Sequence, residues 1–302
     1  MMEVVFLGTA GSFPTRDRNL VATLVICGNK RFLVDCSEGV QRQILRSGRG
    51  LRNLCRILIS HAHLDHFLGL AGLIFTLDTT NSVEMIEVFG NVEVQDAVSK
   101  LLDIFPRKSN LVIKQVTIDA GIVYEDEGLK CSTFECSHTV KCHGFIFEER
   151  GGRRFLKDKA RELGVPEGPL RRQLVEGKSV DLPNGSCVTP DMVLSAPEPG
   201  AKLAYVSDSA FSEILVENCR NADVLICEAT FLNRDRSLAA RFGHLTAKEA
   251  ALLAKEANVG RLVINHISSR YREKEIVNEV TSVFSNSGLA NDFDLIRLTG
   301  RP

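Results

Sequence analysis

A hexapeptide rich in imidazole and carboxylate groups, His61-Ala62-His63-Leu64-Asp65-His66, directly follows the apolar segment Arg56–Ser60. The apolar segment predicts a short buried strand, and the residues after the hexapeptide lead into a helix, so the hexapeptide occupies a strand-to-helix turn. At such a turn, side chains at different offsets can converge on one point. Neutral imidazole and carboxylate are ligand types that zinc accepts. This pattern predicts a metal site in preference to a polar helix start that Asp65 merely caps.

Three further residues of the same chemical types follow other predicted strands. Alone, each could be an ordinary polar residue at the end of a loop. Together they stand at strand ends, where a sheet presents its functional loops, and the combined set contains five of the seven histidines. The predicted strands and the residues that follow them are Leu129–Cys136 with His138, Lys202–Val206 with Asp208, and Arg261–Asn265 with His266.

Seven candidate ligands exceed the four that a single tetrahedral zinc takes. We therefore expect two ions about 3.5–4 Å apart, the arrangement that handles phosphodiester displacement, with water activated between them. Asp208 is the carboxylate expected to bridge the two ions. The predicted ligands of one ion are His61, His63 and His138, and those of the other are Asp65, His66 and His266.

A second pair, Glu228 and His244, is typical of proton transfer. Glu228 ends the predicted strand Asp223–Glu228, and His244 opens a predicted helix. A carboxylate bonded to one imidazole nitrogen fixes the tautomer and raises the basicity of the other nitrogen. His244 could then protonate a departing oxygen as a general acid. The alternative is a histidine at a helix start that has no catalytic role.

Composition limits the classes of function and the compartment. The 302 residues are 44% hydrophobic and 25% charged, with a formal net charge of −1, so a surface for nucleic acid would have to be local. The chain has no Trp and three Tyr, which argues against recognition of unpaired bases by aromatic stacking. Nine cysteines without Cys-x-x-Cys spacing indicate reduced, buried thiols. With no signal peptide and no apolar run that could span a bilayer, we expect a cytoplasmic protein without membrane contact.

The order of predicted elements favours one α/β domain, residues 1–302, with an inserted arm at about 151–200. The stretch from Gly151 to Gly200 holds six of the nine prolines and few long apolar runs. Strands dominate before this stretch, and strands alternate with helices after it. Residues 92–105 and 246–257 are among the predicted helices.

Several motifs along nearly the whole chain resemble the tRNase Z family of the metallo-β-lactamase superfamily. The hexapeptide is specific only to the superfamily, whereas Glu-Ala-Thr, His-x-Thr and Ser-Ser-Arg-Tyr are specific to this family and its closest relatives. The matching stretches are Phe6 to Thr9, Asp35 to Gln43, His61 to His66, His138 with His143 to Phe145, Ser207 to Ser209, Glu228 to Phe231, His244 to Ala247, and His266 to Tyr271.

This resemblance implies an αββα four-layer sandwich with a protruding arm, two Zn²⁺ ions per chain and a homodimer. It also implies an endoribonuclease that removes the 3′ trailer of precursor tRNA and leaves a 3′-hydroxyl. Asp65 would be both a ligand and a participant in water activation, with His244 and Glu228 in proton transfer. The family loop Pro-x-Lys-x-Arg-Asn corresponds to Pro14–Asn19, with Arg in place of Lys. Substrate contacts expected near the site are Arg16, Arg18, Asn19, Ser268, Ser269 and Arg270.

The inserted arm matches the tRNA-gripping arm of the same family, which contains a Gly-Pro turn, here Gly168-Pro169. From Arg153 to Lys178, eight basic residues stand against four acidic ones, a local excess that could hold duplex phosphates and read shape. A helix face of mixed charge exposed to solvent is the alternative. The expected tRNA contacts of the arm are Arg153, Arg154, Gly168, Pro169, Arg171 and Arg172.

Two other functions remain open on the sequence alone. One is a phosphodiesterase of the same fold that acts on another RNA or on a small diester. It would use the seven metal ligands, but the basic arm would have no role. A non-catalytic RNA-binding relative would not need to keep all seven ligands.

Overall fold

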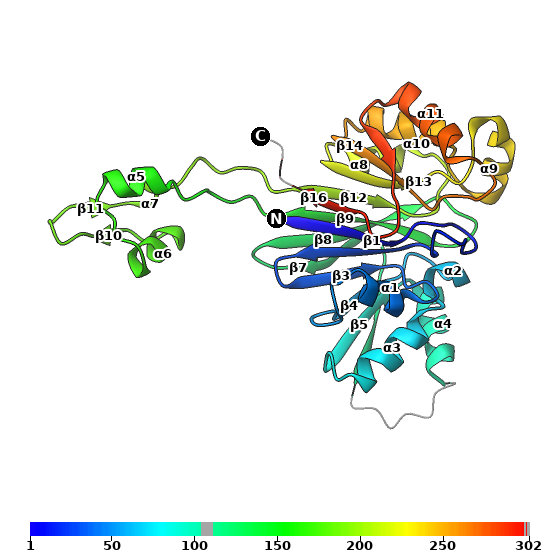
Figure 1. Cartoon of the computed structure of the whole chain (residues 1–302), viewed down its shortest axis with the longest axis horizontal. Coiled ribbons are helices and arrows are strands. Elements are labelled where there is room, and N and C mark those ends of the chain that lie inside the picture. Colours follow the sequence, from blue (N-terminus) through cyan, green and yellow to red (C-terminus); the bar gives the residue numbers. More distant parts are fainter. Residues whose placement is uncertain (104–110, 299, 301–302) are drawn as a thin grey trace. The chain divides into compact units, whose positions relative to one another are not determined.

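Two seven-stranded sheets, faced by helices, form most of the chain in the computed structural model, which describes residues 1–103, 111–298 and 300 (Figure 1). The chain divides into two compact units. The core unit contains Met1–Glu149 and the segment that starts at Ala201, and the arm unit contains Arg150–Gly200. No helix among the described residues is long and apolar enough to cross a membrane.

The first sheet has the strand order β16-β1-β2-β3-β4-β5-β6. The strands from β16 to β3 pair antiparallel, and those from β3 to β6 pair parallel. Parallel strands require crossover connections, which the helices on one face supply. The strands are β1 (Met2–Gly8), β2 (Ala22–Cys27), β3 (Lys30–Val34), β4 (Arg56–Leu58), β5 (Met85–Gly90), β6 (Val112–Thr117) and β16 (Leu295–Leu298).

The second sheet has the order β15-β14-β13-β12-β9-β8-β7. Here β7, β8, β9 and β12 pair antiparallel, and β12 to β15 pair parallel. The carboxyl ends of β12, β13 and β14 therefore meet at one edge of the sheet. The strands are β7 (Gly121–Glu125), β8 (Leu129–Cys136), β9 (Cys142–Glu149), β12 (Lys202–Val206), β13 (Val224–Glu228), β14 (Arg261–Asn265) and β15 (Ser287–Leu289).

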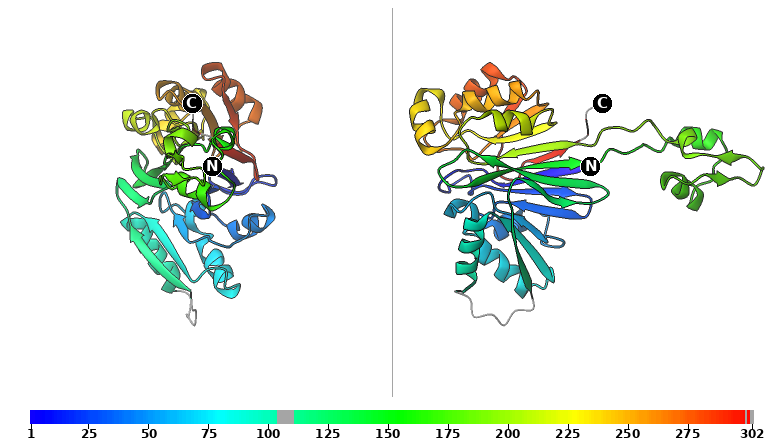
Figure 2. Two further views of the ribbon diagram at one scale, coloured as in Figure 1. Left: turned by 90° about the vertical axis from the view of Figure 1, so that its left-hand side faces the viewer. Right: turned by 180° about the vertical axis from the view of Figure 1, so that it is seen from behind.

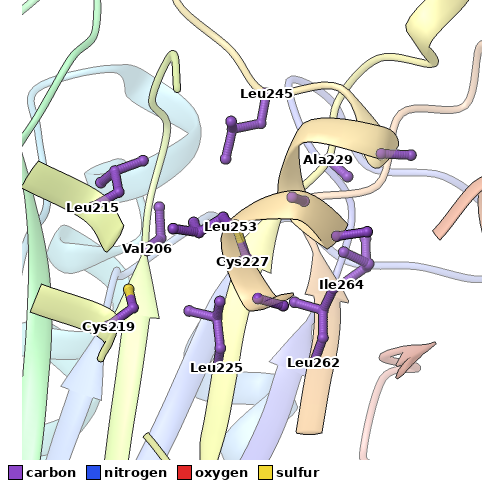
Figure 3. Close-up of a cluster of buried hydrophobic side chains, with 14 of the residues drawn as sticks. Val206, Leu215, Cys219, Leu225, Cys227, Ala229, Leu245, Leu253, Leu262 and Ile264 are labelled. Atoms are coloured by element: carbon purple, nitrogen blue, oxygen red, sulfur yellow. The ribbon is translucent and has the colours of Figure 1, made fainter. Parts of the chain in front are cut away.

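Helices cover the outer face of each sheet, and both views of the core unit show the resulting layers (Figures 1 and 2). Side chains of α1, α3 and α4 share a buried apolar cluster with the first sheet, and side chains of α8, α10 and α11 share one with the second sheet (Figure 3). The helical segments of the core unit are α1 (Val40–Arg46), α2 (Leu64–Phe67), α3 (Leu70–Thr79), α4 (Val92–Asp103), α8 (Glu213–Cys219), η1 (Asn233–Asp235), α9 (Arg236–Phe242), α10 (Ala247–Glu256) and α11 (Glu273–Val283).

A third apolar cluster joins the inner faces of the two sheets. It contains Phe32 from β3 and Phe147 from β9, whose ring centroids lie 5.4 Å apart in an edge-to-face arrangement. The predicted αββα four-layer fold is thus confirmed. Strands β8, β12 and β14 have the predicted bounds. The predicted helix over 92–105 ends at Asp103 within the described part, and its last two predicted residues lie outside the described residues.

The arm unit has a small core of its own. Ala160, Leu174 and Val193 are fully buried in an apolar cluster within this unit. Gly168 has φ 116° and ψ −144°, a backbone conformation that favours glycine, and Pro169 opens the following helix, where its missing N–H costs nothing. The elements are α5 (Lys157–Glu162), α6 (Pro169–Val175), β10 (Val180–Asp181), β11 (Cys187–Val188) and α7 (Pro190–Val193).

Candidate metal centre

The loops that follow strands of both sheets bring the seven predicted ligands together. In the first sheet, the chain leaves β4 through Ser60, whose backbone N–H donates to Asp35 Oδ1 at 2.9 Å, and α2 then begins at Leu64 within the hexapeptide. In the second sheet, Asp208 and His266 follow β12 and β14, and His138 lies in the turn between β8 and β9. Residues far apart in sequence thus meet at one end of the two sheets.

Asp208 is the centre of this group. Its Oδ2 lies 3.8 Å from His61 Nε2, 3.6 Å from His66 Nε2 and 3.9 Å from His138 Nε2. Its Oδ1 lies 3.5 Å from His266 Nε2. One set of ligand atoms within 4.8 Å of one another comes from His61, His63, His138 and Asp208, and a second comes from Asp65, His66 and His266.

Hydrogen bonds at Nδ1 orient three of these imidazoles so that Nε2 faces Asp208. The Nδ1–H of His66 donates to Asp35 Oδ2 at 2.9 Å, and that of His138 donates to the Gly243 carbonyl at 2.8 Å. Thr230 Oγ1 donates to Glu228 and therefore accepts from His266 Nδ1 at 2.9 Å. Such bonds fix the tautomer that presents a lone pair at Nε2, which is how histidine ligands of metals are commonly held.

Buried polar atoms that have no hydrogen-bond partner indicate whether a metal fits this group of residues. His66 Nε2, His266 Nε2 and Asp208 Oδ1 are buried and have no hydrogen-bond partner among the described residues. Leaving such groups unpaired inside a protein is costly, unless a cation or another ligand binds them. Burial also lowers the pKa of His61, His63 and His138, so these imidazoles are neutral and able to act as ligands. The donor set therefore fits a metal.

The backbone is strained at two positions of the centre. Asp35 has φ 60° and His266 has φ 52°, both in the left-handed region that non-glycine residues rarely adopt. Such conformations concentrate at functional sites, where the surrounding structure holds them. Gly11 is required here because a Cβ at this position would lie 2.5 Å from the ring of His266.

Glu228 and His244 lie beside the ligands and are bonded to each other. The Nδ1–H of His244 donates to Glu228 Oε1 at 2.8 Å, and the His244 ring stacks on that of His266 with centroids 5.7 Å apart. Burial lowers the pKa of His244, but the charge and hydrogen bond of Glu228 outweigh this effect and raise it to about 9. The turn that carries His244 is fixed by Thr246, whose hydroxyl caps α10.

Five of the predicted ligands and His244 line a cleft of about 380 Å³, whereas His61, His66 and Glu228 are buried and are not part of its lining. The lining also includes Phe231 and Phe242, two aromatic side chains that were not predicted as site residues. His244 lines the same cleft, with 12% of its side chain exposed.

Comparison with known proteins assigns the family. Residues 2–153 match the family model described as anti-Pycsar protein Apyc1, and residues 188–267 match the β-lactamase superfamily domain. A ribonuclease Z from Bradyrhizobium sp. (strain ORS 278) is 42% identical over 302 residues, which cover 99% of this chain and 100% of that protein. The chain belongs to the ribonuclease Z family.

Two further proteins resemble this ribonuclease Z family chain over nearly its whole length. The ribonuclease Z of Archaeoglobus fulgidus is 37% identical over 304 residues, which cover 99% of this chain and 98% of that protein. The crystal structure of the short form of human tRNase Z superposes with a TM-score of 0.71 at 23% identity, covering 98% of both chains. The latter shows that the fold is shared.

The Pro14–Asn19 loop of this ribonuclease Z family chain divides into buried and exposed parts. Arg18 is 8% exposed, and its guanidinium donates to Glu273, Thr9, the Ala290 carbonyl and Asn291. Its donors are therefore engaged within the fold, and a role in substrate contact stays a prediction.

Arg16 is exposed and lines a larger cavity of about 760 Å³ together with the loop and α1. The Asn19 side chain donates to the Glu38 carbonyl at 3.0 Å. Among the predicted contacts after His266, Ser269 and Arg270 are exposed and Ser268 is half-buried. The Arg270 guanidinium lies 5.9 Å from the centroid of the cleft residue Phe231.

Ion pairs within the arm unit use many of its basic groups. Arg153 pairs with Asp191, and Arg171 pairs with Glu167. Both arginines also donate to backbone carbonyls, and their side chains are only 30% and 19% exposed, so they brace the arm. Other pairs join side chains that are largely solvent-accessible, and these are weak. They are Arg154–Glu198, Arg161–Asp158, Arg172–Glu176 and Lys178–Glu176.

Proposed function

We propose that the chain is an endoribonuclease that removes the 3′ trailer from precursor tRNA and leaves a 3′-hydroxyl on the tRNA. One observation carries this proposal: a member of the ribonuclease Z family keeps seven ligand-type side chains close together, beside a bonded Glu228–His244 pair whose histidine opens onto the same cleft as five of them. A non-catalytic RNA-binding protein would not need to retain such an arrangement.

We assign the seven groups to two zinc ions. His61, His63 and His138 would hold one ion, and Asp65, His66 and His266 would hold the other. Asp208 would serve both ions, since its two oxygens lie near different histidines. When bound, such a pair supplies charge neutralisation at the phosphate and a water activated near neutral pH. Asp65 supports this assignment further, because its Oδ2 accepts from the Ser12 N–H at 3.0 Å, which orients the carboxylate.

His244 is proposed to carry the proton that the departing 3′ oxygen requires. Its Nδ1 is committed to Glu228, so Nε2 is the ring nitrogen left for the substrate. Glu228 is a positioning residue, because it acts on the substrate only through His244. The exposed Arg270 and Arg16 are the side chains that we propose contact phosphates near the cleft.

We propose that the arm unit binds tRNA through exposed cations that do not brace it. Lys157 and Lys159 are exposed and have no ion pair among the described residues, while Arg161 and Arg172 form only pairs open to solvent. The Gly168-Pro169 turn fixes the start of α6, which carries Arg172.

Removing the arm should weaken tRNA binding and spare small diester hydrolysis. A deletion of residues 153–197 would join Gly152 directly to Glu198, which already pair through the Glu198 N–H and the Gly152 carbonyl at 2.9 Å. Because several cations would no longer meet the tRNA phosphates, we expect affinity for precursor tRNA to fall by about 10³-fold at moderate salt. Turnover of bis(p-nitrophenyl) phosphate should remain within about threefold, because that substrate needs only the cleft.

The double variant Lys157→Ala/Lys159→Ala is the matched control, since it removes cations and leaves the arm core intact. It should show a smaller loss of affinity with a shallower dependence on salt. If the deletion reduced both activities equally, the arm would be a structural part of the enzyme, and the hypothesis of a small-diester phosphodiesterase would gain support.

We also propose a homodimer in the cytoplasm, where precursor tRNA would be available. Exposed apolar side chains close together in sequence support the dimer: Leu64, Leu68 and Phe75, which belong to α2, α3 and the residues between them, are 63%, 43% and 66% exposed. Large apolar side chains that gather in solvent commonly mark a contact surface. Sedimentation analysis should find two chains per particle, and Leu68→Glu should shift the particle to a monomer. A wild-type monomer at micromolar concentration would contradict this assignment.

A further inference from the structure

A second cluster of ligand-type residues lies outside the centre described above. Asp119 is in the loop between β6 and β7, Glu135 is on β8, and His143 is on β9. One carboxylate oxygen of each acid and one ring nitrogen of His143 lie within 4.8 Å of one another. Glu135 and His143 are directly opposite in the β8–β9 pair, so their side chains share one face of the sheet.

His143 is the informative member of this cluster. Its side chain is 0% exposed, and neither ring nitrogen has a hydrogen-bond partner among the described residues. An imidazole that is buried without any partner is destabilising, because it has given up its hydrogen bonds to water. Burial lowers the pKa of His143, so the ring is neutral near pH 7 and offers a lone pair. A ligand on this nitrogen would remove that cost.

We infer that Asp119, Glu135 and His143 form a third metal site, which binds a divalent cation of the Mn²⁺ or Zn²⁺ type. One imidazole and two carboxylates are a donor set that these cations accept, with water completing the coordination shell. The two carboxylates are exposed, so a cation can enter from solvent, and His143 closes the site from the protein side.

Lys141 is the internal competitor for this site. Its ammonium group is bonded to Asp119, and its side chain is 40% exposed. A divalent cation displaces the ammonium group of Lys141 from Asp119, and the Lys141 side chain can then turn towards solvent. The competition predicts modest affinity in the wild-type protein and tighter binding once the lysine charge is removed.

The position of the site suggests its role. The turn between β8 and β9 carries His138, which belongs to the predicted metal centre, and the His143 N–H donates to the Ser60 carbonyl at 3.0 Å, beside His61. A cation at the third site joins the Asp119 loop to this hairpin. It would hold the hairpin in place and take no part in the chemistry at the cleft.

Metal counting tests the inference. The purified full-length protein, loaded with zinc, is dialysed against a defined concentration of Mn²⁺, and total bound metal is measured by plasma mass spectrometry. Wild type should hold one cation per chain more than Glu135→Gln. Glu135 is suited to this test because it is exposed and its side chain has no hydrogen bond or ion pair among the described residues. Glu213→Gln on α8 makes the same charge change at an exposed position and should match wild type.

Lys141→Gln distinguishes a cation site from a simple ion pair. Removing the competing ammonium should tighten Mn²⁺ binding about fivefold, the size of one exposed ion pair. A rise in melting temperature with Mn²⁺ should appear in wild type and in Lys141→Gln and be absent in Glu135→Gln. Equal metal content in wild type and Glu135→Gln, or unchanged binding in Lys141→Gln, would overturn the proposal without touching the proposed nuclease function.

Discussion

Asp208→Asn is expected to lower cleavage of precursor tRNA by about 10³-fold, because several kcal/mol of transition-state stabilisation would depend on the metal ions that Asp208 is proposed to hold. Both oxygens of this carboxylate face histidines of the centre, at 3.5 Å on one side and 3.6–3.9 Å on the other. A carboxamide in place of the carboxylate keeps the shape and loses the charge, so both groups of ligands are weakened together. Metal content per chain, measured after dialysis, should fall in parallel with activity.

Binding of precursor tRNA should survive this substitution, since the exposed cations proposed to contact tRNA are elsewhere in the chain. Asp96→Asn on α4 is the matched control: it makes the same chemical change at an exposed carboxylate that pairs only with Lys100 among the described residues. It should leave metal content and turnover unchanged. Wild-type metal content together with wild-type turnover in Asp208→Asn would refute the proposed centre.

His244→Ala is expected to reduce cleavage of precursor tRNA by about 10²–10⁴-fold, the usual contribution of a general acid. The effect should depend on the leaving group. A ribose 3′ oxygen needs a proton as it departs, whereas p-nitrophenolate leaves readily without one. Hydrolysis of bis(p-nitrophenyl) phosphate by His244→Ala should therefore remain within about tenfold of wild type.

The contrast with Asp208→Asn makes this experiment decisive, because that variant should lose both activities. Metal content of His244→Ala must be measured alongside, and should equal that of wild type. If His244→Ala lost RNA cleavage and small diester hydrolysis to the same extent, His244 would support the centre structurally and would not act as the proton donor.

The sequence predicted the buried strands well and the exposed elements poorly. Strands β12 and β14 are compact apolar runs, and the longer β8 intersperses apolar and polar residues, so hydrophobic patterning indicates all three. Strand β7 was not predicted: its apolar run is only the three residues Ile122 to Tyr124, and none of its five residues is fully buried. Strand β16 completes the first sheet beside β1, a pairing between the two ends of the chain that no local pattern encodes.

Residue type and position at strand ends were enough to predict which side chains meet at the centre. The residues that orient them were harder to recognise. Asp35 directly follows β3, but only the fold reveals that its Oδ2 lies 2.9 Å from His66 Nδ1. Thr230 belongs to the Glu-Ala-Thr motif, yet a threonine after a strand has many ordinary roles. The burial of Arg18 likewise depends on Glu273 and Ala290, which are remote in sequence.

The hydrogen bonds that Glu228 accepts limit which side chain can replace it. Its Oε1 accepts from Ser209 N, His244 Nδ1 and Leu245 N, while its Oε2 accepts from the backbone and hydroxyl of Thr230. Every neighbour is a donor, so a glutamine would point its amide N–H groups at other N–H or O–H groups in either flip state. An aspartate would lack the reach to satisfy both sides. The arrangement leaves glutamate as the one standard side chain able to orient His244 directly and His266 through Thr230 at the same time.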